Sequence, residues 1–198
     1  KPEIGLSFAN GLRSLLRQNP DILMIGEIRD EETASIAIQA SNTGHLVIST
    51  LHTNSAVGVV SRLASMGVSG GDLANAANLF MAQRLVRKLC PHCRVSTPAT
   101  KEEKEIIEKA LKSLPQKNKL QNKIPKKLNI FKSKGCSKCN GTGFTEQIPI
   151  SETLLIDKEI SELIARGALV SEIEEKAVAK DMLTLTQDGI LSVLEGVT

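Results

Sequence analysis

Two apolar segments that end in polar residues constrain the fold of this chain more than any other feature. Ile22–Ile25 leads into Gly26 and the carboxylate of Glu27, and Leu46–Thr50 leads into a second polar stretch. Continuous apolar runs of this length are typical of parallel strands that helices cover on both faces. A helical pattern that begins after Asp30 separates the two runs. Strand, helix and strand in this order predict an α/β fold with a parallel sheet.

Along the whole chain, composition and periodicity predict three segments. Residues 1–89 form the α/β segment, residues 90–147 contain all four cysteines, and residues 148–198 read as a strand followed by helices. A short strand is expected at Ile148–Ile156 and a Lys- and Pro-containing linker at Pro115–Lys134. Apolar periodicity and capping residues predict helices at Ser7–Gln18, Ser55–Met66, Asp72–Lys88, Thr100–Leu114, Lys158–Ala165, Val170–Ala179 and Thr184–Glu195.

The four cysteines occur as two C-x-x-C pairs, Cys90 with Cys93 and Cys136 with Cys139, and 42 residues separate the pairs. Two such pairs place four thiolates where they complete a tetrahedral zinc site. His92 lies between the first two cysteines, but four sulfurs already fill the coordination shell. The alternatives are two disulfides, which the absence of a secretory signal disfavours, and a redox C-x-x-C, which leaves the second pair unexplained. We therefore expect structural zinc.

Lysines are concentrated in the middle of the chain. Residues 101–139 carry twelve lysines and four glutamates, whereas residues 140–198 carry four basic and eleven acidic groups. A basic surface of this kind attracts nucleic acid or anionic lipid. Binding of single strands also uses stacking aromatic side chains, yet the chain has no Trp, no Tyr and four Phe. Residues 112–138 are therefore interpreted as a solvated loop, and nucleic acid is not expected as a partner.

Polar residues gather around the ends of the two predicted strands. Glu27 follows the first strand, Arg29 lies two residues further on, and His45 and His52 bracket the second strand. In α/β sheets the carboxyl ends of the strands face the ligand. A carboxylate there can orient a water for attack on a γ-phosphate, or reach Mg²⁺ through water. The alternative for Glu27 alone is an ordinary exposed acid, so the group of residues is what favours a phosphate site.

Two further arginines, Arg13 and Arg17, lie one helical turn apart and share a face of the first predicted helix. They are either solvated or part of a phosphate clamp. A phosphate-binding loop of the pattern G-x-x-x-x-G-K-[ST] does not occur in the chain. The residues alone therefore indicate only part of a nucleotide site.

Four stretches of the sequence closely resemble the GspE/PilB family of ATPases, the motors of type II secretion and type IV pilus assembly. They are GLRSLLRQNPDILMIGEIRDEETASIAIQASNTGHLVISTLHTN, AQRLVRKLCPHC with CSKCNGTGF, and the closing MLTLTQDGILSVLEGVT. The resemblance covers nearly the whole chain. It implies part of a RecA-like ATPase core with a parallel sheet, a tetracysteine zinc module and C-terminal helices.

The same resemblance implies roles for individual residues. Glu27 matches the Walker B glutamate, which activates water and organises Mg²⁺, and the stretch from His45 to His52 matches the histidine box near the nucleotide. The four cysteines match the zinc ligands. The arginines that match family arginines implicated in phosphate contact or hexamer assembly are Arg13, Arg17 and Arg29. Because the family's Walker A loop lies upstream of this stretch, the chain is expected to be an inactive piece of a longer protein whose cofactors are ATP, Mg²⁺ and Zn²⁺.

The resemblance also implies a homohexamer that acts on an inner-membrane platform protein, cytoplasmic and peripheral to that membrane. Assembly or secretion is expected rather than pilus retraction, because the retraction branch lacks the tetracysteine module. Two features depart from the family: the Lys-rich insertion, and Gln147 where an arginine is usual. The rival hypotheses are a non-enzymatic zinc scaffold that binds nucleic acid through residues 112–138, and a degenerate, inactive homologue.

Overall fold

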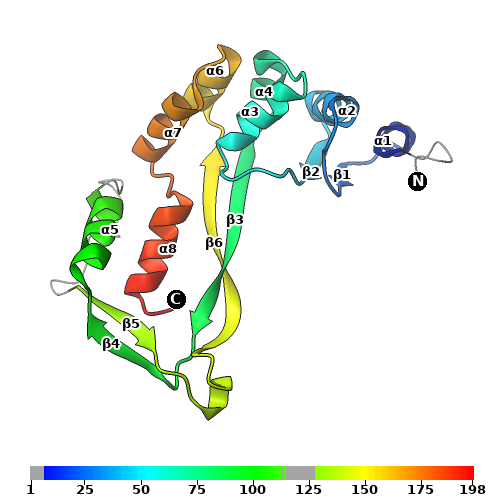
Figure 1. Ribbon diagram of the computed structural model, residues 1–198. Helices are drawn as coiled ribbons and strands as arrows, with labels where there is room; N and C mark the ends of the chain where they lie inside the picture. The colour runs from blue at the N-terminus through cyan, green and yellow to red at the C-terminus, as the bar shows by residue number, and fades with distance from the viewer. Residues whose placement is uncertain (1–6, 113, 115–127) are drawn as a thin grey trace. The chain divides into compact units, whose positions relative to one another are not determined.

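The computed structural model describes residues 7–112, 114 and 128–198 (Figure 1). Its helices are α1 (Phe8–Leu16), α2 (Glu31–Asn42), α3 (Gly58–Ser65), α4 (Gly70–Ala76), α5 (Lys101–Lys112), α6 (Lys158–Ala165), α7 (Val170–Ala179) and α8 (Leu185–Leu194), with a 3₁₀ turn, η3, at Ser137–Cys139. Its strands are β1 (Ile22–Ile25), β2 (Leu46–Ser49), β3 (Leu79–Leu89), β4 (Arg94–Pro98), β5 (Asn129–Ser133) and β6 (Phe144–Leu155).

The contacts between residues divide the chain into two compact units. The first holds the described residues up to Phe80 together with Leu154–Lys176. The second holds the described residues of Met81–Thr153 together with Ala177–Thr198. Both units are discontinuous in sequence, whereas the three segments expected from the sequence are consecutive; those three segments stay a prediction.

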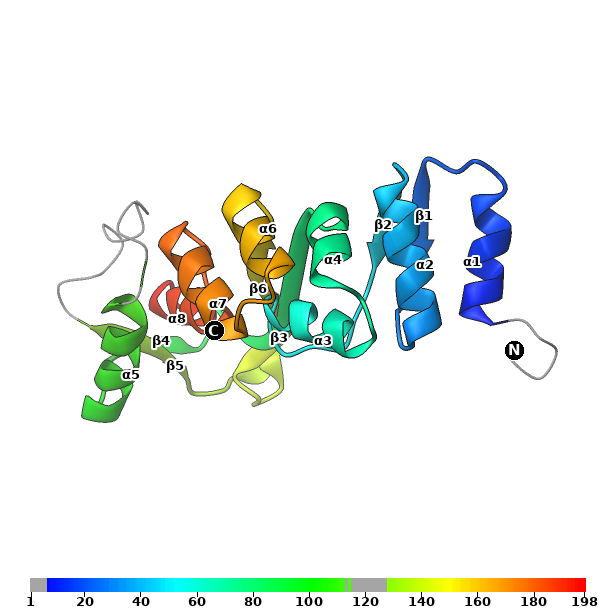
Figure 2. The same cartoon turned by 90° about the horizontal axis from the view of Figure 1, so that it is seen from above.

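The first unit contains the parallel sheet. β1 and β2 pair in parallel, with Ile22 opposite Leu46, and α2 connects them and runs alongside both strands (Figure 2). The start of α2 is fixed by Asp30, whose carboxylate accepts a hydrogen bond from the backbone N–H of Thr33 at 2.8 Å. This side chain satisfies one of the N–H groups that the first turn of a helix leaves without a partner. The predicted α/β fold with a parallel sheet is confirmed.

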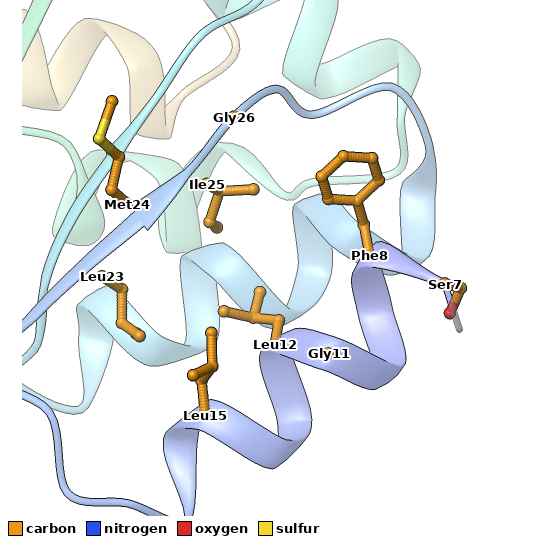
Figure 3. A pocket seen from close by; sticks show the side chains of 9 residues that line it. All are labelled: Ser7, Phe8, Gly11, Leu12, Leu15, Leu23, Met24, Ile25 and Gly26. Atoms are coloured by element: carbon orange, nitrogen blue, oxygen red, sulfur yellow. The ribbon is translucent and has the colours of Figure 1, made fainter. Parts of the chain in front are cut away.

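Helices cover one face of this sheet among the described residues. Leu23 and Ile25 are buried, and Figure 3 shows both pointing toward the side on which α1 and α2 lie. Successive side chains of a strand point to opposite faces, and those on the other face are exposed: Ile22, Met24, Leu46 and Ile48. The expectation that helices cover both faces is therefore wrong for the described residues, since α1 and α2 lie on the same side.

The helix predicted over Asp72–Lys88 is wrong in its second part. α4 ends at Ala76, and Leu79–Leu89 forms β3, which pairs with β6. The Ala- and Leu-rich composition favours a helix locally, but strand formation depends on pairing with a distant segment, which leaves little local signal. α4 itself packs closely against α6, because a Cβ added at Gly70 would lie 2.5 Å from the carbonyl oxygen of Ile164.

The second unit contains an antiparallel pair of strands, β4 and β5, with Arg94 opposite Ser133. The linker expected over Pro115–Lys134 is therefore wrong at β5, and residues 115–127 lie outside the described part of the chain. A small apolar core joins this pair and α5 to α8. Its members are Ala99, Ile107, Leu111, Leu128, Ile130, Ile190, Val193 and Leu194.

The helices predicted near the end of the sequence are confirmed. α6 and α7 have the predicted bounds, and α8 follows its N-cap Thr184. Thr184 and Gln187 form a reciprocal capping box, in which each side chain accepts a hydrogen bond from the backbone of the other. In the part of the chain that the structure describes, no helix is both long and apolar enough to cross a membrane.

Candidate functional site

Glu27 lies immediately beyond β1, at the edge of the sheet where both parallel strands end. Its Oε2 lies 2.5 Å from Nε of Arg29 and 3.3 Å from Nε2 of His52, which follows β2. The Glu27 side chain is 22% exposed, whereas those of Arg29 and His52 are 69% and 86% exposed. Three of the residues predicted from the sequence therefore meet in one group, with the carboxylate at its centre.

The charges of this group keep Glu27 ionised. The hydrogen bond from Arg29 is the main cause that lowers the pKa of the Glu27 carboxyl below its ordinary value, and the Arg29 charge and His52 act in the same direction. Partial burial opposes them, but it does not reverse the shift. An ionised carboxylate can accept a hydrogen bond from a water or bind a divalent cation, and these are the two functions that a nucleotide-hydrolysing site requires of it.

Thr50 holds the ends of the two strands together. Its Oγ1 donates a hydrogen bond to the carbonyl oxygen of Gly26 at 2.7 Å, and its own carbonyl oxygen accepts from the backbone N–H of Ile28 at 3.0 Å. In the sequence, Thr50 is only the last residue of the second predicted strand. The signal that identifies it is the parallel register, which places Ile25 opposite Ser49 and hence Thr50 beside Gly26.

His45 lies at the other end of β2. Its Nδ1 lies 3.0 Å from the carbonyl oxygen of Ala40, and its backbone N–H donates to the same oxygen, so it closes the end of α2. Thr50 follows His45 by five positions along extended chain, roughly 16 Å at the usual rise of a strand. The structure therefore does not bring His45 into the group around Glu27, because the two histidines bracket the strand instead of sharing an end of it.

The arginines of α1 differ in their surroundings. Nη2 of Arg13 lies 2.8 Å from Oε1 of Glu32 on α2. Arg17 is the C-cap residue of α1 and is exposed, and it has no ion pair or hydrogen-bonding side-chain partner among the described residues. Arg13 thus has a partner within its own unit, whereas the Arg17 guanidinium faces solvent.

An apolar cavity lies between α1 and β1, next to the strand end that carries Glu27. It has a volume of about 380 Å³, and its lining includes Phe8, Leu15, Met24 and Gly26 (Figure 3). Apart from Ser7, the lining side chains are apolar or absent. Cationic side chains, which often bind phosphate groups, are absent from this lining as the structure describes it.

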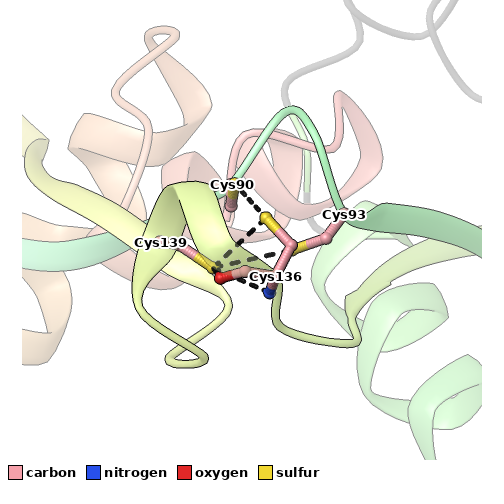
Figure 4. A group of neighbouring side chains, drawn as sticks. All are labelled: Cys90, Cys93, Cys136 and Cys139. Carbon is pink, nitrogen blue, oxygen red and sulfur yellow. Dashed lines mark hydrogen bonds between the residues drawn. The ribbon is translucent and has the colours of Figure 1, made fainter.

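The four cysteines converge in the second unit (Figure 4). Their sulfur atoms all lie within 4.8 Å of one another. The separations are 3.9 Å for Cys90–Cys136, 3.8 Å for Cys93–Cys139 and 3.7 Å for Cys136–Cys139. A tetrahedral Zn²⁺ with Zn–S bonds of ~2.3 Å has S···S edges of about 3.8 Å. The cluster therefore has the dimensions of a Cys₄ zinc site, and all four thiols are free of disulfides.

The turn after Cys136 prepares one sulfur to bind a metal. The backbone N–H groups of Cys136 and Gly143 both donate to Sγ of Cys139 at 3.2 Å. Burial acts to raise the pKa of the Cys139 thiol, but these two donors and the neighbouring thiols outweigh it and lower the pKa to about 6. Burial and the surrounding thiols instead raise the pKa of Cys93 to about 12. Metal binding therefore requires proton release from the cluster.

Gln147, which departs from the resembling family, lies in β6 and is exposed. It belongs to the second unit, whereas Glu27, Arg29 and His52 belong to the first.

Sequence comparison relates the chain to known ATPases. Residues 1–198 match the family described as Type II/IV secretion system protein. The chain is 43% identical to the type IV pilus assembly ATPase PilB of Thermus thermophilus, over 100% of this chain and 21% of that protein. It is 42% identical to the type II secretion system ATPase E of Vibrio cholerae, over 100% of this chain and 36% of that protein. The predicted resemblance to the GspE/PilB family is thus confirmed.

Structural comparison supports the fold. The ATPase DotB of Legionella pneumophila aligns with a TM-score of 0.62 and 22% identity, covering 96% of this chain and 39% of DotB. The pilus retraction motor PilT with bound ADP aligns with a TM-score of 0.51 and 22% identity, covering 94% of this chain and 43% of PilT. Identity at this level supports the fold alone. The chain spans well under half the length of the relatives it matches, and it belongs to the type II/IV secretion system protein family.

Proposed function

We propose that this chain carries the catalytic carboxylate of an ATP-hydrolysing motor that powers type IV pilus assembly or type II protein secretion. The observation that carries the proposal is the group of Glu27, Arg29 and His52 at the carboxyl ends of two adjacent parallel strands. The relatives at 42–43% identity are named as ATPases of these two machines. The proposed core is RecA-like, as the family resemblance implies, and the chain shares its fold with DotB and PilT.

In this proposal each member of the group has a separate task. Glu27 accepts a hydrogen bond from the attacking water and takes up its proton as the water reaches the γ-phosphate. Arg29 keeps Glu27 ionised between turnovers. His52 orients the carboxylate while most of its own surface remains accessible. Mg²⁺, when bound with ATP, neutralises charge on the β- and γ-phosphates, and Glu27 is the residue of this chain that would hold it through a water.

The phosphate-binding loop belongs to a different part of the polypeptide in this proposal. The chain has no G-x-x-x-x-G-K-[ST] pattern, and it corresponds to 21–36% of the length of its relatives. A Walker A loop upstream of residue 1 would supply the missing contacts. The 198 residues alone are then expected to hydrolyse no ATP.

We further propose that the four cysteines bind one structural Zn²⁺. Sulfur separations of 3.7–3.9 Å support this, as do the two backbone N–H donors to Cys139. The two C-x-x-C pairs come from opposite ends of a long insertion, so a shared ion would join those ends. The ion in this role stabilises the fold and takes no part in hydrolysis.

A homohexamer that pushes on an inner-membrane platform protein from the cytoplasmic side completes the proposal. This part rests on the family resemblance. The exposed Arg17 guanidinium is the feature of this chain that suits a contact between subunits, because an arginine from a neighbouring subunit can stabilise charge on the γ-phosphate during transfer.

The test is the variant Glu27→Gln in the full-length gene product, which keeps the size of the side chain and removes its charge and basicity. We expect ATP to bind with unchanged affinity and the turnover rate to fall by about 10²-fold or more, the usual contribution of a general base. Glu31→Gln, an exposed glutamate four residues away on α2, is the matched control and should retain turnover. Normal hydrolysis by Glu27→Gln would overturn the assignment.

A further inference from the structure

We infer that Thr50 is a positioning residue for Glu27: its hydroxyl fixes the backbone that aims the carboxylate at the attacking water. The inference rests on the proposed function, because it assumes that Glu27 is the catalytic base. Thr50 does not touch the reacting atoms in this proposal and acts on them through Glu27.

Thr50 binds the backbone on both sides of Glu27. The hydroxyl donates to the carbonyl oxygen of Gly26, the preceding residue, at 2.7 Å. The Thr50 carbonyl accepts from the N–H of Ile28, the following residue, at 3.0 Å. Glu27 is therefore held at its two flanking peptides by a single residue of the neighbouring strand end.

Packing among the described residues does not hold the backbone at Gly26. Gly26 has no side chain, and a Cβ built at this position would meet no atom of those residues within 4 Å, its two chain neighbours aside. Ile28, in contrast, is 6% exposed and anchored in the core. The conformation at Gly26 is thus restrained by its hydrogen bond to Thr50 and by the strand that precedes it. Glycine gives the backbone more freedom than any other residue, so losing this restraint would let the Gly26–Glu27 peptide move.

The two hydrogen bonds of Thr50 differ in what they require of the side chain. The bond from Ile28 uses the Thr50 backbone carbonyl and survives any substitution. The bond to Gly26 uses Oγ1, which serine retains and valine lacks. Valine has nearly the same shape as threonine and suits extended backbone, so it removes the hydroxyl with little other change.

The two hydrogen bonds of Thr50 also set the distance between Glu27 and His52. Thr50 lies two residues before His52, and Nε2 of His52 lies 3.3 Å from the Glu27 carboxylate. A shift of the Gly26–Glu27 peptide would change this distance and the direction in which the carboxylate points. A misplacement of about 1 Å in a catalytic group can cost about 10²-fold in rate. Loss of the Thr50–Gly26 hydrogen bond should therefore lower turnover without weakening nucleotide binding.

The experiment compares Thr50→Val, Thr50→Ser and Glu27→Gln in the full-length gene product, by measuring kcat for ATP and the Kd of a fluorescent ATP analogue. We expect Thr50→Val to lose at least tenfold in kcat with an unchanged Kd, and Thr50→Ser to recover to within about threefold of wild type. Thr97→Val is the control, because the Thr97 hydroxyl on β4 also donates to a backbone carbonyl, that of Ile130. This variant should leave kcat unchanged.

Three outcomes would overturn the inference. Thr50→Val could turn over like wild type while Glu27→Gln is inactive, which leaves the proposed function standing and removes the role of Thr50. Thr50→Ser could be as slow as Thr50→Val, which shows that the hydroxyl is not what matters. Thr50→Val could lose nucleotide affinity and thermal stability along with kcat, which indicates a purely structural role. An active Glu27→Gln would instead overturn the proposed function.

Discussion

Nε of Arg29 lies 2.5 Å from Oε2 of Glu27, two residues earlier in the same loop after β1. The pair is local in sequence, so the loop itself supplies the cation that keeps the carboxylate charged. Arg29 is 69% exposed, which leaves most of the guanidinium open to solvent or to a phosphate. Its effect on the Glu27 pKa is the part of its role that can be measured directly.

Replacing Arg29 should change how hydrolysis depends on pH. Arg29 lowers the pKa of Glu27, and a general base works only when it is deprotonated. Hydrolysis therefore falls as the pH drops through that pKa, and a higher pKa moves the fall to higher pH. We expect Arg29→Gln to shift the acid limb of kcat/KM toward neutral pH. Arg62 is an exposed arginine on α3, and Arg62→Gln should leave the acid limb of kcat/KM at its wild-type pH. An acid limb at the same pH in both variants would contradict the prediction.

The sequence predicted the positions that depend on neighbouring residues. Glu27 and Arg29 were expected at the end of a strand, where the structure places them, and the two C-x-x-C turns predicted that the four cysteines converge. It failed where the outcome depends on pairing between distant segments. Residues 79–89 look helical by composition but pair with β6, and Asn129–Ser133 looks like linker but pairs with β4. The role of Thr50 depends on the same kind of information, since only the register of β1 and β2 places it beside Gly26.

The tetracysteine cluster should bind about one zinc per chain, because four thiolates satisfy one tetrahedral ion. We expect elemental analysis of the 198-residue chain, prepared without added metal, to give this ratio. Cys136→Ser should lower the zinc content and increase hydrogen exchange in β4 and β5, while the exchange of β1 and β2 stays as in the wild type. A chain that is metal-free and linked by disulfides would contradict the prediction.

Gly196 should tolerate no side chain. Its φ of +71° lies in the left-handed region, and a Cβ there would lie 2.4 Å from Cδ2 of Phe131. Gly167 has a similar φ of +69°, but a Cβ there would meet no atom of the described residues within 4 Å. Both alanine variants are destabilised by the strain of an L-residue in this backbone conformation, about 1 kcal/mol. Only Gly196→Ala adds a clash. Thermal unfolding should therefore show a larger drop in Tm for Gly196→Ala, and equal drops would mean that Phe131 moves aside easily.

Arg13 on α1 and Arg17 at the C-cap of α1 should respond differently to substitution. Arg13 forms an ion pair with Glu32 at 2.8 Å between side chains that are 51% and 56% exposed. Exposed pairs of this kind contribute about 0–1 kcal/mol, so Arg13→Lys should change Tm and turnover little. Arg17 has no such partner among the described residues, so its exposed guanidinium is open to a group outside them.

If Arg17 reaches the nucleotide of a neighbouring subunit, Arg17→Lys in the full-length gene product should lower ATP turnover at every protein concentration at which subunits assemble. Lysine keeps the charge but cannot reproduce the two parallel N–H donors of a guanidinium. The Tm should stay at the wild-type value, since Arg17→Lys removes no side-chain contact with the described residues. The measurement is specific activity against protein concentration. Turnover equal to wild type throughout would make Arg17 an ordinary solvated residue at the end of α1.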